Sequence, residues 1–393
     1  MRAMSNTSSR RALLKQLGFA GLGLSLAELP VWALPPLGAG DVVAQFTDYP
    51  ASFNPTPTPQ NRTLDLRTMD GVFTPKDRFF AMQHYGHPQV DLAAFRLKVG
   101  GLVNKPLTLS LDDLKKMRAT DLVAGFECSG NSPRSMQGLS GNGKWTGVPL
   151  RAVLDQAGVK AEAREFVFFG ADHGQEEIEW RTQKFTLEQQ FGRSLTREHA
   201  LSPEPMLVWA LNGEPLTVHQ GAPLRLIVPG WYGVANVKWL TDIYVQDEAF
   251  LGKFQTRWYR TLRGETINGE TKWVETAVTR MRVKSFIARV TTNGNAATVH
   301  GFVLSDGTSV KSVEVNVDGG AWQPATIDSA SVKDKYGWKI FSYTWNNPTP
   351  GDHTLVSRAT DANGIVQPTA KDLENKKSFL EDNSQFVRKV KIG

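Results

Sequence analysis

The stretch Gly125-Phe126-Glu127-Cys128-Ser129-Gly130-Asn131 holds the only cysteine of this 393-residue chain. An apolar run gives way here to small and polar residues, which predicts a strand that ends in a loop and presents a thiol there. The residues alone leave three interpretations of Cys128. The first is a buried structural cysteine, because free cysteines are among the most buried residues. The second is a nucleophile, which needs a nearby histidine as base. The third is a thiolate ligand of a soft or high-valent metal.

A single cysteine also limits the redox chemistry of the chain. No internal disulfide can form, and no Cys-x-x-Cys-His motif exists for a covalent c-type haem. Iron–sulfur clusters held by protein cysteines and Cys-rich zinc sites are excluded on the same count. Any redox centre must therefore be held by few protein bonds.

Outward from the cysteine, short strands and modest helices alternate, which predicts an α+β domain over residues 64–260. Apolar residues at helical spacing predict two helices, and Ser110 is a plausible N-cap for the first. The expected helices are Leu111–Met117 and Leu150–Ala157, and the expected strands are Phe95–Val99, Glu165–Phe169, Leu224–Ile227 and Trp239–Val245.

Beyond about Val283 the chain becomes β-rich, and Asn-Gly, Asp-Gly and Gly-Gly turns separate its short runs. We expect a second domain over residues 261–393, an all-β sandwich of immunoglobulin-like size, with residues 246–282 connecting the two. The expected strands are Phe286–Val290, Ala297–Val303, Val310–Val317, Trp338–Trp345 and His353–Thr360.

The N-terminus is typical of a targeting segment. Residues 8–15 carry paired arginines, an apolar stretch follows, and Val31-Trp32-Ala33 suits cleavage. We interpret residues 1–33 as a signal peptide similar to twin-arginine signals, which predicts a periplasmic protein. The apolar stretch is too short and glycine-rich for a membrane span, which needs about 20 apolar residues, so no span is expected after processing. Residues 34–63 are expected to form an extended arm or linker.

Composition narrows the class of partner. The 40% hydrophobic and 21% charged fractions are those of a soluble globular protein. Lys+Arg 45 against Asp+Glu 39 gives a formal charge of +6, and part of the excess lies in the first 15 residues. No basic run with interleaved aromatic residues is present, so we expect no nucleic acid partner.

Several segments around and beyond the cysteine resemble the sulfite oxidase family. The resemblance covers about residues 60–390 and includes the β-rich second domain, which looks like that family's dimerisation domain. The segments that carry it are Cys128-Ser129-Gly130-Asn131, Trp145-Thr146-Gly147-Val148-Pro149-Leu150, Asn212-Gly213-Glu214-Pro215-Leu216, residues 221–233, Val237-Lys238-Trp239-Leu240 and Phe379-Leu380-Glu381-Asp382-Asn383.

The resemblance implies one molybdenum–molybdopterin cofactor per chain, with Cys128 as the only protein ligand of the metal. Arg225 and Lys238 would hold the cofactor's phosphate and pterin, as their cationic groups suit an anion. Asp172 stands where the family contacts the pterin. The full set of cofactor-binding residues implied is Phe80, Ala81, Met82, Gln83, His84, Cys128, Asp172, Gln220, Arg225, Asn236, Val237 and Lys238.

Three positions depart from the family pattern. Met82 stands where typical sulfite oxidases have an arginine that binds the oxyanion, and it cannot donate a hydrogen bond. Trp209 stands at the usual place of an active-site tyrosine and lacks a titratable hydroxyl. Gln220 replaces a pterin-binding histidine, although a one-residue shift would make His219 its equivalent. Arg134, six residues after Cys128, is a candidate for the missing positive charge, and with Cys128 and Trp209 it completes the predicted catalytic set.

The resemblance implies oxidation of sulfite or a related sulfur compound by oxygen-atom transfer. Electrons would pass to a separate c-type cytochrome, and the second domain would pair two chains in a homodimer. Two alternatives stay open: an enzyme of the same fold that reduces an S-oxide or N-oxide, which Met82 and Trp209 would suit, and a metal-free binding protein whose second domain is the functional part.

Overall fold

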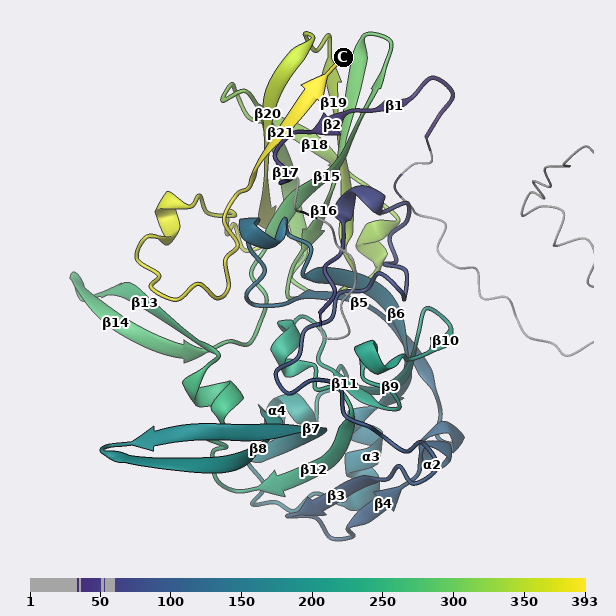
Figure 1. Ribbon diagram of the computed structural model, residues 1–393, viewed down its shortest axis with the longest axis vertical. Helices are drawn as coiled ribbons and strands as arrows, with labels where there is room; N and C mark the ends of the chain where they lie inside the picture. The colour runs from purple at the N-terminus through teal and green to yellow at the C-terminus, as the bar shows by residue number, and fades with distance from the viewer. Residues whose placement is uncertain (1–33, 35–36, 51–52, 54–60) are drawn as a thin grey trace, which may run out of the picture. The chain divides into compact units, whose positions relative to one another are not determined.

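Three larger sheets organise the part of the chain that a computed structural model describes, residues 34, 37–50, 53 and 61–393 (Figure 1). The signal segment predicted at residues 1–33 lies outside these ranges, as does part of the arm predicted at 34–63. Within them, no helix has both the length and the apolar character needed to cross a membrane.

Two five-stranded sheets build the first domain. In one, the strand order is β4-β3-β12-β7-β8, and β3 and β12 run parallel. In the other, the order is β10-β9-β6-β5, and β11 pairs with β9. The strands are β3 (Leu97–Gly101), β4 (Leu107–Leu109), β5 (Thr120–Glu127), β6 (Ser140–Pro149), β7 (Glu165–Trp180), β8 (Gln183–Thr196), β9 (Met206–Leu211), β10 (Glu214–Pro215), β11 (Arg225–Ile227) and β12 (Leu240–Gln246).

The helices of this domain are short. Both predicted helices are confirmed as α2 (Leu111–Lys116) and α3 (Leu150–Ala157), and α4 (Arg197–Ala200) was not predicted. Ser110 caps α2 as expected, because its side chain accepts a hydrogen bond from the Asp113 amide and the Asp113 carboxylate accepts one from the Ser110 amide. The described part of the domain thus contains far more strand than helix.

The second domain is β-rich and antiparallel, with strand order β1-β15-β16-β19-β18-β17-β20-β21-β2. Although several strands separate β15 and β20 in this order, the two make direct contact, so the sheet folds back on itself around an apolar core. The strands are β1 (Val42–Val43), β2 (Gln45–Phe46), β15 (Lys284–Asn293), β16 (Ala296–Leu304), β17 (Val310–Val317), β18 (Gln323–Ile327), β19 (Lys339–Asn346), β20 (Gly351–Asp361) and β21 (Val387–Ile392). Hence part of the predicted arm supplies strands β1 and β2.

One apolar cluster joins the two domains. Phe126 and Trp145 of the first domain belong to the same buried cluster as Phe286 and Trp338 of the second. The contact is close at Gly125 in β5, where an added Cβ would lie 2.5 Å from Cδ1 of Trp338. The strand that leads to Cys128 is therefore held directly against the second domain. The domain boundary drawn at residue 260 stays a prediction.

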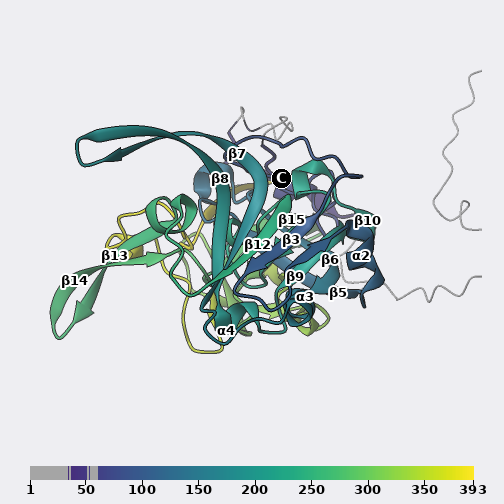
Figure 2. The ribbon, with the colours of Figure 1, turned by 90° about the horizontal axis from the view of Figure 1, so that it is seen from below.

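Two hairpins were not predicted from the sequence. Strands β7 and β8 continue as a long antiparallel pair well past the sheet. Within the segment expected to be a simple connection, β13 (Arg260–Ile267) and β14 (Glu270–Ala277) form a two-stranded sheet, and Arg263 of β13 also bridges to Lys376. Both extend from the same side of the described chain (Figures 1 and 2). Their outer parts contact little else, so no periodic core pattern marked them in the sequence.

Candidate active site

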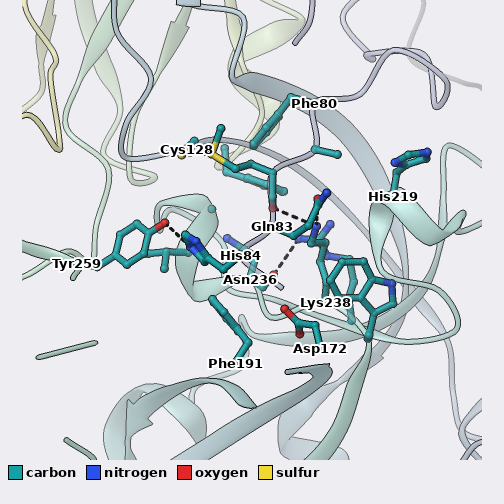
Figure 3. Close-up of a pocket in the computed structure, with 17 residues that line it drawn as sticks. Phe80, Gln83, His84, Cys128, Asp172, Phe191, His219, Asn236, Lys238 and Tyr259 are labelled. Atoms are coloured by element: carbon teal, nitrogen blue, oxygen red, sulfur yellow. Dashed lines mark hydrogen bonds between the residues drawn. The ribbon is translucent and has the colours of Figure 1, made fainter. Parts of the chain in front are cut away.

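A cavity enclosing about 650 Å³, part of it open to solvent, lies beside Cys128 (Figure 3). Segments far apart in the sequence build it, including the loop after Phe79, the loop after β5, the irregular middle of β7 and the turn before β12. The predicted residues that line it are Phe80, Ala81, Met82, Gln83, His84, Cys128, Asp172, Arg225, Asn236 and Lys238.

Cys128 begins the loop that follows β5, as the sequence predicted. Its backbone amide donates to the carbonyl of Leu139, 2.8 Å away, and its own carbonyl accepts from the Asn131 amide at 2.9 Å. The thiol is partly exposed to the cavity. Burial raises the pKa of Cys128 to about 11, so a metal that binds this sulfur must displace its proton.

The cavity wall around the thiol is apolar. The sulfur of Met82 lies 4.0 Å from Sγ of Cys128, and Phe80 and Phe126 add apolar walls. Met82 is 39% exposed and offers no hydrogen-bond donor. This end of the cavity therefore presents a soft, apolar surface where an oxyanion site would present a guanidinium.

His84 and Tyr259 form a neutral pair beside the thiol. Nε2 of His84 and the Tyr259 hydroxyl are 2.8 Å apart and share a hydrogen bond. Burial, with Lys253 and Lys238 nearby, lowers the pKa of His84 to about 4, and burial raises the pKa of Tyr259 well above its ordinary value. At neutral pH the imidazole is therefore uncharged and the phenol keeps its proton. In the tautomer that carries the proton on Nε2, His84 donates to the Tyr259 oxygen, and the phenol proton is then free to donate into the cavity.

Asp172 reaches the cavity through an irregularity in β7. The pairing of β7 with β8 shifts register between Phe169 and His173, which is the kind of bulge that re-aims a side chain. Gly170 is required there, because a Cβ would lie 2.5 Å from Oδ1 of Asp172 and 2.6 Å from the Lys238 carbonyl. Burial raises the pKa of Asp172 to about 6, and Lys238 opposes that rise.

Lys238 is the central cation of the cavity. Its Nζ donates to the Met82 carbonyl at 3.1 Å and to Oε1 of Gln83 at 3.2 Å (Figure 3). Burial, together with the Arg225 guanidinium, lowers the pKa of Lys238 to about 7. An anionic ligand would restore the charged form, because an opposite charge nearby favours protonated lysine.

Several polar atoms around the cavity are buried without a hydrogen-bond partner among the described residues. They are Nε2 of Gln83, Oδ1 of Asp172, Nδ1 of His219 and Nε of Arg225. The other two guanidinium nitrogens of Arg225 donate hydrogen bonds to the carbonyls of Gln220 and Asn236, at 2.9 and 3.0 Å. Unpaired buried groups cost free energy, so a cluster of them facing one cavity indicates a polar ligand.

The structure favours His219 over Gln220 at the position that the sequence left open. Gln220 is buried and caps a short 3-10 helix, η3 (Val218–Gln220): its Oε1 accepts from the Thr217 amide at 3.0 Å, and its Nε2 donates to the Lys76 carbonyl at 2.8 Å. His219 lines the cavity instead. Val237 also lies outside the lining, because its side chain is buried in the core of the first domain.

Neither Trp209 nor Arg134 is brought to the cavity. Trp209 lies in β9, where its ring packs against the apolar core of the first domain. Arg134 lies in η2 (Pro133–Ser135) and is exposed to solvent. The geometry therefore does not support the predicted catalytic roles of these two residues. Each lies near a family motif in the sequence, but the fold does not bring either side chain to the cavity.

Several residues that line the cavity were not assigned to the site from the sequence, although Trp239 lies in one of the segments that resemble the family. Phe191 comes from β8, Trp239 follows Lys238, and Tyr259 comes from the connection between the domains. Tyr259 is the most informative, since it supplies a phenol that Trp209 cannot. Only its position next to Trp258 could have drawn attention to it, and an aromatic pair does not distinguish a site residue from core.

Two family models match the chain. The model described as "Oxidoreductase molybdopterin binding domain" matches residues 84–254, and "Mo-co oxidoreductase dimerisation domain" matches residues 271–392. Mitochondrial sulfite oxidase from Homo sapiens is 29% identical over 343 residues, which covers 80% of this chain and 60% of the human protein. Sulfite oxidase from Arabidopsis thaliana is 26% identical over 338 residues, covering 75% of this chain and 82% of the plant protein.

Among solved structures, the crystal structure of the sulfane dehydrogenase SoxCD from Paracoccus pantotrophus matches with a TM-score of 0.71 at 24% sequence identity, covering 98% of this chain and all of the matched chain. In the sequence comparisons, the chain spans about 60% of the length of the mitochondrial sulfite oxidases that it matches. Taken with the cysteine-headed cavity, both domain matches lead to one conclusion: the chain belongs to the sulfite oxidase family of molybdopterin-dependent oxidoreductases.

Proposed function

We propose that this protein oxidises sulfite or a related sulfur compound by oxygen-atom transfer and passes the electrons to a separate c-type cytochrome. The observation that carries the proposal is the single thiol of Cys128 at the head of a cavity whose deeper wall holds Lys238 and four unpaired polar atoms. For sulfite, the balanced reaction adds one oxygen from water to sulfur and releases sulfate, two protons and two electrons.

The cavity fits the molybdenum–molybdopterin cofactor of the family. Cys128 would ligate the metal, and the cations Lys238 and Arg225 would hold the anionic part of the pterin. The unpaired atoms of Asp172 and Gln83 match the polar edges of a pterin ring, which both donates and accepts hydrogen bonds. When bound, the cofactor supplies the exchange of an oxygen atom with sulfur and the transfer of two electrons.

The chain's own residues then bind and orient the substrate. The apolar walls of Phe80 and Phe126 exclude water from the thiol, and Tyr259 holds a proton on its hydroxyl, from which it can donate to an oxygen of the substrate. His84 fixes that hydroxyl through its hydrogen bond and remains neutral. The cations that line the cavity, Lys238 and Arg225, are the ones that would hold the cofactor, so they contribute potential but no direct clamp on the substrate.

The substrate assignment is tested by turnover of protein purified from the periplasmic fraction. We expect one molybdenum per chain and reduction of ferricyanide with sulfite, or with thiosulfate-derived sulfane sulfur, as electron donor. Protein that contains molybdenum but oxidises none of these donors, and instead consumes reduced viologen with an S-oxide, would move the function to the reductase alternative.

Replacing Met82 with arginine tests how the substrate is bound. A charge-assisted hydrogen bond contributes about 1.5–3 kcal/mol, so Met82→Arg is expected to lower the KM for sulfite by about tenfold or more. The exposed fraction of Met82, 39%, leaves room for the longer side chain. The measurement is sulfite-dependent ferricyanide reduction, with Met82→Leu as the matched apolar control. An unchanged KM in the arginine variant would show that sulfite does not bind beside residue 82.

The reductase alternative is supported by the same neutral surroundings. Met82, His84 and Tyr259 present no charge at neutral pH, and a neutral S-oxide or N-oxide needs no cationic clamp. The metal-free binding protein is disfavoured. A binding role confined to the second domain would not explain why buried polar atoms without hydrogen-bond partners surround the cavity of the first domain.

We further propose periplasmic localisation through the twin-arginine route, an immunoglobulin-like topology for the second domain and a homodimer formed through it. The paired arginines of residues 8–15 support the first. The antiparallel strands of the second domain support the second, and its match to a dimerisation domain supports the third.

A further inference from the structure

Three basic side chains, Arg62, His87 and His219, gather beside the Cys128 cavity, and we call them the basic pocket. His219 lines the cavity, and Figure 3 shows it on the side away from Cys128 and Tyr259. The rings of His87 and His219 meet edge to face, with their centroids 4.6 Å apart. The Arg62 guanidinium is close enough to lower the pKa of both histidines.

The backbone where the predicted arm ends places Arg62 at the cavity. Arg62 and Ala81 exchange two backbone hydrogen bonds, of 2.9 and 3.1 Å, and Ala81 lines the cavity. Two residues further on, the Leu64 amide donates to the Gly138 carbonyl at 2.8 Å, in the segment that follows Cys128. This part of the chain, which the sequence marked only as a linker, is therefore fixed along the edge of the cavity.

Each residue of the basic pocket has a buried nitrogen without a hydrogen-bond partner among the described residues. These atoms are Nε of Arg62, Nε2 of His87 and Nδ1 of His219. Nη1 of Arg62 donates to the Asp77 carbonyl at 2.9 Å, so the guanidinium is oriented while Nε stays available. A histidine can carry its proton on either ring nitrogen. Because unpaired buried donors cost free energy, three of them together indicate an acceptor that the polypeptide does not supply.

The charged groups that act on the two histidines are all positive. Burial, and then Lys238 and Arg62, lower the pKa of His87. Burial, and then Arg62, His87 and Lys238, lower the pKa of His219 to about 4. An anion in the basic pocket would raise both values, because an opposite charge nearby favours the protonated form of histidine.

Two carboxylates lie near these cations. Asp172 attracts Lys238 and Asp77 attracts Arg62, as the direction of the pKa shifts shows. Asp77 is exposed, so water screens its charge. Neither carboxylate acts on the histidines, which thus have no acidic partner among the described residues.

Two members of the basic pocket lie outside the predicted cofactor-binding set. Arg62 also precedes residues 84–254, which the molybdopterin-binding model matches. His87 lies three residues beyond His84, where that set left the segment. A role for these two side chains therefore follows from the geometry of this chain and from no motif.

We propose that the basic pocket binds the phosphate group of the molybdopterin cofactor, with Arg62 and His87 as ligands in addition to His219. A phosphate monoester carries up to about two negative charges and three strong acceptor oxygens, which suit the three unpaired nitrogens. Lys238 and Arg225 then remain for the pterin. The proposal rests on the proposed function, because it concerns the cofactor that this function needs. Free inorganic phosphate is the competing ligand.

The test measures how tightly the holoenzyme keeps its cofactor. Wild type, Arg62→Gln, His87→Gln and the double variant are incubated in dilute solution, and the pterin that dissociates is measured by its fluorescence. Each single variant should release the pterin at least about tenfold faster, because a hydrogen bond to a charged group is lost. Arg78→Gln is the matched control, since the Arg78 guanidinium also donates to a backbone carbonyl, that of Thr68 at 2.8 Å.

Calorimetry with inorganic phosphate gives a second measurement, which does not depend on how much cofactor a variant takes up. The cofactor-free full chain should bind phosphate, and the double variant should bind it at least about tenfold more weakly. The wild-type holoenzyme should bind none, because the phosphate group of the cofactor already fills the basic pocket.

The outcomes separate the basic pocket from the proposed function. Release at the wild-type rate from both single variants overturns the proposal, as does equally fast release from Arg78→Gln. Phosphate that binds the holoenzyme as tightly as the cofactor-free chain also overturns it, because the basic pocket is then a separate anion site. A holoenzyme that oxidises no sulfur donor refutes the proposed function instead, and the release rates still decide whether the basic pocket holds the phosphate group.

Discussion

Replacing Cys128 with serine is expected to remove molybdenum-dependent turnover almost completely. The thiolate is a soft, charged ligand, and serine offers a hydroxyl that stays protonated at neutral pH, so the metal would lose its only bond to a protein side chain. Substitution of groups that merely orient a metal ligand costs 10–100-fold in affinity or activity, so loss of the ligand itself should lower turnover by more than about 100-fold. Molybdenum content and sulfite-dependent ferricyanide reduction measure the result.

The adjacent serine provides a matched control for this substitution. Ser129 is buried, and its hydroxyl has no hydrogen-bond partner among the described residues, so Ser129→Ala removes an oxygen without breaking a hydrogen bond. We expect that variant to retain its metal and its activity. A Cys128→Ser protein that kept more than about a tenth of the wild-type turnover would contradict the assignment of Cys128 as metal ligand, since loss of the only protein ligand must exceed that effect.

The second large effect concerns a buried ion pair beneath the Cys128 loop. Glu127, directly before the cysteine, and Lys284, the first residue of β15 in the second domain, are each 1% exposed, and their charged atoms are 3.0 Å apart. Asn131 donates to the same carboxylate oxygen at 2.8 Å, and its Oδ1 accepts from the Leu139 amide at 3.0 Å. The second domain thus anchors both ends of the loop that presents the thiol.

Replacing Lys284 with methionine is expected to lower the free energy of unfolding by about 3–5 kcal/mol, because it leaves the Glu127 carboxylate buried without its counter-ion. Burial already raises the pKa of Glu127, and Lys284 opposes that rise, so the lysine stabilises the charged form. Denaturant unfolding of the cofactor-free protein measures the loss. Molybdenum content should fall as well, since the loop loses its contact with the second domain.

Neutralising both partners separates a stranded charge from a general packing defect. The double variant Glu127→Gln/Lys284→Met keeps a side-chain oxygen for Asn131 and contains no unpaired buried charge, so it should recover most of the lost stability. If the double variant were as unstable as Lys284→Met alone, the damage would come from lost packing around residue 284, and the ion pair would not be the anchor of the loop.

Local pattern predicted several of the regular elements that bury one face, although β4, β9 and β21 were not predicted. Helix Leu150–Ala157 was predicted to the residue, since its apolar side chains recur at helical spacing on one buried face. The end of β5 before Cys128 followed equally from the change to small and polar residues. The β7–β8 hairpin was not predicted beyond Phe169. Glutamate alternates with Ile178 and Trp180 over only a few residues, and no turn signal of the Asn-Gly type joins the two strands.

By itself, the sequence determined the family, the cofactor and the identity of the thiol, because these depend on motifs that are contiguous in the chain. Ten of the twelve residues predicted to bind the cofactor line the cavity, and their roles there stay predictions. Only the tertiary structure decided that Tyr259 meets His84, that His219 faces the cavity in place of Gln220, and that Lys284 lies beneath Cys128. The physical reason is that such contacts join residues up to 175 positions apart. The packing of the two domains determines these contacts, and the order of neighbouring residues in the sequence does not reveal how the domains pack.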